Sequence, residues 1–133
     1  MGRAIYKPDP ERDEYLIFST IVDAPVSPVM NREEIFEEWR TSCEQLYGAR
    51  PSLEETEMSL ARADAQGQSW REPGSYWAEE EIVRVVNMRP SSPIEMAWCK
   101  HRDLAKLTRA VAAGDWDRVR ELLTVIEPEL ERK

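Results

Sequence analysis

Two successive stretches of this chain, residues 31–48 and 52–67, each begin and end with the signals of an amphipathic helix. An Asn or Ser precedes a Glu by three residues, which is typical of a capping box, in which two side chains satisfy free N–H groups in the first helical turn. A Gly that can adopt a left-handed conformation closes each stretch. We therefore expect two consecutive helices. Their signals are Asn31, Glu34 and Gly48 for the first, and Ser52, Glu55 and Gly67 for the second.

Apolar residues recur along both stretches at helical spacing, which predicts one buried face on each helix. The apolar face of the second helix is the thinner of the two. On the first helix Glu33, Glu37 and Glu44 form a separate acidic stripe. The residues that we expect to be buried are Ile35, Phe36, Trp39, Cys43, Leu46 and Tyr47 in the first helix, and Leu53, Leu60 and Ala61 in the second.

Acidic residues are concentrated on this helical pair. Residues 31–65 hold nine Asp or Glu against four Lys or Arg, whereas residues 98–133 hold seven against eight. The formal net charge of the whole chain is −8, which opposes non-specific attraction to nucleic acid or to an anionic membrane. We therefore expect a soluble protein whose partner is a protein with a basic surface, with no direct nucleic-acid or membrane partner.

Three segments favour strands over helices. Residues 15–22 form a continuous run of β-branched and aromatic residues, which predicts a strand covered on both faces. Residues 4–6 can form a short companion strand, and the two prolines within residues 23–28 exclude regular structure there. Residues 82–88 fit either a helical face or a strand, and their β-branching favours the strand.

The last third of the chain predicts an αα-hairpin, because Gly114 ends one helical pattern and Asp115 caps the next. Pro93 favours an earlier helix start, which would place Trp98 on a helical core face. The two faces of the hairpin are Leu104, Leu107, Thr108 and Val111 in one helix, and Trp116, Val119, Leu122, Leu123 and Ile126 in the other.

Together these elements predict a single α+β domain over residues 1–133. A small sheet from residues near 4–7, 15–22 and 82–88 is expected to pack against four or five helices, and the αα-hairpin ends the chain. A chain of 133 residues can bury a core without disulfides or metals. No apolar run approaches the ~20 residues of a membrane span, and no secretory signal is visible. We therefore expect a cytoplasmic protein with Cys43 and Cys99 reduced.

Few residues suggest chemistry. His101 is the only histidine and lies two residues after Cys99, but a zinc site needs three or four ligands and residues two apart on a helix point away from each other. We expect a histidine at the surface or at a helix end. The five glycines are isolated, so no phosphate-binding loop is present. We therefore expect no catalytic residue, no metal site and no cofactor.

Residues 4–8 and 15–25, which include the turn Ser19-Thr20-Ile21-Val22-Asp23-Ala24-Pro25, resemble small uncharacterised accessory proteins of actinobacteria and their phages. The resemblance covers roughly the first 25 residues and the general style of the rest, namely acidic helices with scattered Trp. It carries no catalytic residues to transfer. It implies a protein that binds and modulates a host protein or a defence system.

The leading hypothesis is a non-enzymatic, phage-related protein–protein interaction module. Trp70, Tyr76 and Trp77 flank a Pro-Gly loop, where they are either exposed anchors for a partner or a lid over the core. One alternative is an inhibitor whose acidic helices imitate nucleic-acid phosphates. Another is a ligand-binding or enzymatic domain with His101 beside these aromatics, and a third is a homo-oligomer that docks through the hairpin. The expected partner-binding residues are Glu33, Glu37, Glu44, Trp70, Tyr76 and Trp77.

Overall fold

The protein has an α+β fold in the computed structural model, which describes residues 2–70, 82–86 and 96–125. Within those residues two three-stranded antiparallel sheets accompany four α-helices. The first sheet comprises β1 (Arg3–Tyr6), β2 (Leu16–Ser19) and β3 (Ala24–Pro25), and the second comprises β4 (Ile82–Val86), β5 (Met96–Lys100) and β6 (Leu123–Val125). The helices are α1 (Arg32–Tyr47), α2 (Leu53–Gln66), α3 (Leu104–Ala113) and α4 (Trp116–Leu122), with a 3-10 turn, η1 (His101–Asp103), before α3.

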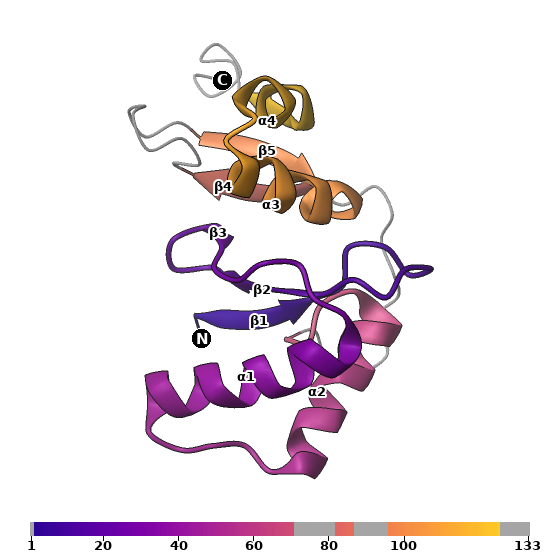
Figure 1. Ribbon diagram of the computed structural model, residues 1–133, viewed down its shortest axis with the longest axis vertical. Helices are drawn as coiled ribbons and strands as arrows, with labels where there is room; N and C mark the ends of the chain where they lie inside the picture. Colours follow the sequence, from indigo (N-terminus) through magenta and orange to yellow (C-terminus); the bar gives the residue numbers. More distant parts are fainter. Residues whose placement is uncertain (1, 71–81, 87–95, 126–133) are drawn as a thin grey trace, which may run out of the picture.

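The layers follow one another along the long axis of the molecule (Figure 1). Helices α1 and α2 lie on one face of the first sheet, the second sheet lies beyond its other face, and α3 and α4 cover the second sheet. The prediction of one sheet is therefore wrong in one respect, because β4 pairs with β5 and not with the N-terminal strands.

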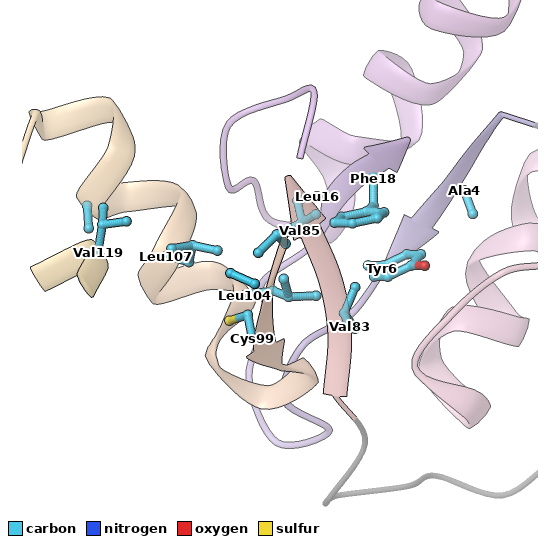
Figure 2. Packing of buried hydrophobic residues seen from close by; sticks show 12 residues of the cluster. Ala4, Tyr6, Leu16, Phe18, Val83, Val85, Cys99, Leu104, Leu107 and Val119 are labelled. Carbon is cyan, nitrogen blue, oxygen red and sulfur yellow. The ribbon is translucent and has the colours of Figure 1, made fainter. Parts of the chain in front are cut away.

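Alternate residues of β1 and β2 enter two separate cores. Ile5 and Ile17 face the helices and pack with Ile35 and Leu60. On the other face Tyr6 and Phe18 stack with ring centroids 4.8 Å apart. Figure 2 shows how that face meets Val83, Val85 and Leu104 in the core between the sheets. The period of two along a strand thus places β1 and β2 at the centre of the molecule.

The first two helices begin and end as predicted. Asn31 and Ser52 each make the two reciprocal bonds of a capping box, and Gly48 and Gly67 are left-handed. Their predicted apolar faces are partly wrong. Leu46, Tyr47, Leu53 and Ala61 are exposed, because the first sheet covers only part of the helix surfaces, and α2 instead buries Thr56 and Ala63.

Both N-terminal strands are confirmed, and β2 is shorter than the predicted strand over residues 15–22. β1 pairs with β2 antiparallel, but β2 ends at Ser19, so Ile21 is 79% exposed and Val22 is 54% exposed in the turn that follows. Asp23 completes this turn with a φ of 52°. The expectation that residues 23–28 lack regular structure is wrong for β3, where Ala24 pairs with Ser19; an edge strand tolerates Pro25.

The C-terminal part combines confirmed and corrected elements. The preference for a strand at β4 and the αα-hairpin of α3 and α4 are confirmed. Trp98 lies on β5 and not on a helix, and α4 ends at Leu122 because the next residues become extended and Leu123 pairs with Cys99. Strand pairing across the sequence overrides the local helical pattern here.

Candidate partner-binding surface

The three glutamates of the predicted stripe lie on the exposed side of α1. Arg50 joins two of them, since its Nη2 is 3.0 Å from Oε2 of Glu37 and its Nη1 is 3.2 Å from Oε1 of Glu44. Arg40 also donates to Glu37, at 3.3 Å. The C-terminal half of the stripe is thus a mixed-charge surface and not a purely acidic one.

Glu33 and Glu37 line one cleft at the start of α1, which we call the α1 cleft. Its volume is about 600 Å³. Among the described residues that line the cleft, Phe36 is the one apolar residue; it is half-buried and packs against the core beneath α1. These described lining residues include three carboxylates and one cation, that of Arg32, so their net charge is negative. The lining residues are Asp13, Asn31, Arg32, Glu33, Phe36 and Glu37.

The guanidinium of Arg32 is already committed to other carboxylates. Its Nη2 donates to Oε1 of Glu57 at 2.7 Å and its Nε donates to Oδ2 of Asp64 at 3.1 Å. The hydrogen bond to Glu57 is the largest influence on Arg32 and, with that to Asp64, raises its pKa against the opposing effect of burial. The backbone N–H of Arg32 donates to Asp13 at 2.8 Å. One wall of the α1 cleft is therefore fixed, and the side-chain acceptors along it include the carboxylates of Asp13, Glu33 and Glu37.

Asp64 continues this network into the first sheet. Tyr15 donates to its Oδ1, and Lys7 Nζ lies 3.4 Å from the same oxygen. Burial is the largest influence on Tyr15 and raises the pKa of its hydroxyl, to which the bond with Asp64 adds. A phenol with a raised pKa stays protonated at neutral pH and so remains a donor to Asp64. The contacts of Asp64 tie the first sheet, α1 and α2 together.

Trp70 is 57% exposed, which agrees with an anchor more than with a lid. Its Nε1 lies 3.4 Å from the hydroxyl of Tyr6, which ties it to β1 and not to the stripe on α1. The other two predicted aromatic anchors, Tyr76 and Trp77, lie outside the described residues. The structure therefore brings Glu33 and Glu37 together, links Glu44 to Glu37 through Arg50, and places Trp70 elsewhere.

The prediction that His101 lies at the surface is wrong. Its side chain is 3% exposed and stacks on Tyr6 with centroids 5.6 Å apart, while Nε2 lies 3.2 Å from the carbonyl oxygen of Gly67. It lies at the turn that precedes α3, so the helix-end part of the prediction is confirmed. The buried ring fills the space between β1 and η1.

The two cysteines are free and buried. Burial, with the nearby charge of Asp103, raises the pKa of the Cys99 thiol to about 12, and burial also raises the pKa of Cys43. Thiolates are the reactive form, so neither thiol is activated. Among residues 2–70, 82–86 and 96–125, no three His, Cys, Asp or Glu side chains converge to hold a metal ion.

Sequence reasoning missed Asp13 and Asn31 as lining residues and assigned Phe36 to the core. Phe36 directly precedes Glu37 and follows Glu33 by three residues, which places it at the border between the apolar face and the acidic stripe. That border position is the signal that could have identified it. No local pattern marks Asp13, because it lies in the loop between β1 and β2 and the pairing of these strands sets its position.

Comparison with models of known protein families, with curated proteins and with solved structures finds no match to this chain. Of the helices within the described ranges, none combines the length and the apolar character needed to cross a bilayer.

Proposed function

We propose that this protein is a non-enzymatic protein-binding module whose α1 cleft accepts a basic segment of a partner protein. The observation that carries the proposal is that half-buried Phe36 lines the same cleft as the carboxylates of Glu33 and Glu37. An Arg or Lys side chain can lie against an aromatic ring and pair with an adjacent carboxylate. An apolar centre within a charged rim is the usual anatomy of a protein interface.

Rigidity of the cleft supports the same function. The capping box at Asn31 holds the first turn of α1, and Arg32 is bonded to Asp13, Glu57 and Asp64. A site that is ordered before binding loses less conformational entropy on association. The mixed charge around Arg50 favours a protein interface over phosphate mimicry, because a nucleic-acid mimic requires uninterrupted negative charge.

The experiment is an NMR titration of the protein with a short Arg-rich peptide, and with a counterpart in which Glu replaces each Arg. We expect the Arg-rich peptide to shift the amides of Asp13 and of residues 31–37 and to saturate. The double variant Glu33→Gln/Glu37→Gln should weaken binding by about tenfold, as expected for loss of charge-assisted contacts. The control variant Glu54→Gln/Asp117→Asn removes two exposed carboxylates that do not line the cleft and should bind as wild type does.

The same three proteins identify the natural partner when they are used as bait in extracts of the source cells. A partner retained by wild type and by the control variant, but lost with Glu33→Gln/Glu37→Gln, fits the proposal. Peptide shifts that are scattered over all acidic surfaces, or equal binding by both double variants, would refute it.

A further inference from the structure

The β1–β2 loop also forms one wall of a second cleft, which we call the η1 cleft. Its other wall is the end of β5, η1 and the start of α3, and its volume is about 400 Å³. Among the described residues, five cations line it against three carboxylates, on a chain whose net charge is −8. Ala105 is the only uncharged residue of this described lining. The cations are Arg12, Lys100, Arg102, Lys106 and Arg109.

The carboxylates of this cleft are deeper than the cations that they hold. Glu14 is 16% exposed and accepts a 2.6 Å hydrogen bond from Arg109, whose side chain is 55% exposed. Asp103 is 22% exposed and lies 3.7 Å from Lys106, which is 60% exposed. An approaching ligand therefore meets positive charge first, and these partly buried carboxylates hold Arg109 and Lys106 in position. Arg12 pairs with Asp9 at 3.9 Å and with Glu14 at 4.0 Å.

Two other cations of the cleft form no ion pair with a carboxylate of the described residues. Lys100 and Arg102 are exposed and make no ion pair within the described ranges, although they line the same cleft. The described lining residues thus carry two more positive charges than carboxylates. A charged lining of this kind offers little to an apolar ligand, since desolvation of the ions would be uncompensated.

We infer that the η1 cleft binds a small phosphate-bearing ligand. A phosphate monoester carries close to two negative charges at neutral pH, which equals the excess charge of the cleft. Guanidinium groups bind phosphate oxygens in pairs, and a Lys adds a compact charge. The volume is that of a small-molecule site, and the acidic remainder of the surface opposes a long nucleic acid.

The experiment is calorimetric titration of the full chain with inorganic phosphate, adenosine monophosphate and citrate at low salt. The first two probes separate a free phosphate from an organic monoester, and citrate reports whether any multivalent anion suffices. The test variant is Lys100→Ala/Arg102→Ala, which breaks no ion pair among the described residues. The control is Arg118→Ala/Arg120→Ala, which removes two exposed cations of α4 outside the cleft, one of which, Arg120, is paired with the exposed Asp117.

We expect one-to-one binding of at least one phosphate probe, weakened by about tenfold or more in Lys100→Ala/Arg102→Ala and unchanged within about twofold in the control. Absence of saturable phosphate binding, equal loss in both variants, or citrate binding as tight as that of the better phosphate probe would overturn the inference. Because none of these variants alters the α1 cleft, the result is independent of the proposed protein-binding function.

Discussion

The hydroxyl of Tyr15 donates a 2.5 Å hydrogen bond to Oδ1 of Asp64, and this contact joins the start of β2 to the last turn of α2. Lys7 reaches the same carboxylate oxygen and also lies over the Tyr15 ring, 5.2 Å from its centroid. Because Arg32 donates to the other oxygen of Asp64, one carboxylate fixes both helices against the first sheet. Arg32 also lines the α1 cleft, so this cluster holds one wall of the cleft in place.

Replacement of Tyr15 by Phe should lower the free energy of unfolding by about 1–2 kcal/mol, because the ring remains while Asp64 loses a donor. Urea denaturation followed by circular dichroism measures the change. Tyr47→Phe is the matched control, since Tyr47 is 60% exposed, and its effect should stay within about 0.5 kcal/mol. Equal effects of the two substitutions would show that the Tyr15 hydroxyl does not stabilise the fold.

The stability of the protein should fall in acid partly through Asp64. Burial acts to raise the pKa of this carboxyl, but the hydrogen bonds from Tyr15 and Arg32, with the charges of Arg32 and Lys7, outweigh it and hold the pKa below the ordinary 3.8. A depressed pKa contributes stability that is complete above 3.8 and is lost as the pH falls through the folded-state value.

Asp64→Asn should therefore be less stable than wild type at neutral pH and lose less stability as the pH falls below 3.8. Chemical denaturation at a series of pH values measures how the free energy of unfolding of each protein changes with pH. The control is Asp117→Asn, which changes a carboxylate whose side chain is 91% exposed. If Asp64→Asn lost as much stability in acid as wild type does, Asp64 would not be a source of the acid sensitivity.

The starts and ends of α1 and α2 could be read from the sequence because capping is local: Asn31 and Ser52 meet residues only three positions away. The burial of their side chains could not, because it depends on how far the first sheet extends. Leu46 and Leu53 fit a helical face and yet lie beyond its edge. The spacing of apolar residues along a helix shows which side of the helix they lie on. Whether each of them is buried depends on how far the neighbouring sheet extends.

The second sheet was harder to predict for a related reason. β6 pairs with β5, and the register brings Leu123 opposite Cys99, a contact between residues far apart in sequence. The local pattern of residues 116–126 continues a helix, and only the partner strand ends it. The α1 cleft has the same origin, since Asp13 reaches α1 through the pairing of β1 and β2. Contacts between residues far apart in sequence therefore determine both the end of α4 and the position of Asp13.

Both thiols should resist alkylation in the folded protein. Burial, with the charge of Asp103, raises the pKa of Cys99 to about 12, and Cys99 has no exposed surface. Reaction with iodoacetamide at about pH 8, near the ordinary thiol pKa, should be slow for Cys99 in native protein and complete in urea. Mass spectrometry of the labelled peptides measures the extent at each cysteine. Rapid native labelling of Cys99 would mean that the core between the sheets opens readily.

The contrast between Leu104 and Leu53 tests the corrected apolar faces directly. Leu104 has no exposed surface and lies in the core between the sheets, whereas Leu53 is 60% exposed at the start of α2. Leu104→Ala should cost about 2–5 kcal/mol through lost burial and the cavity left behind. Leu53→Ala should change stability by no more than about 0.5 kcal/mol. Denaturation midpoints at equal protein concentration compare them. A large cost at Leu53 would show that a second copy or a partner covers it in solution, and its dependence on protein concentration distinguishes the two, because only self-association gives a midpoint that rises with concentration.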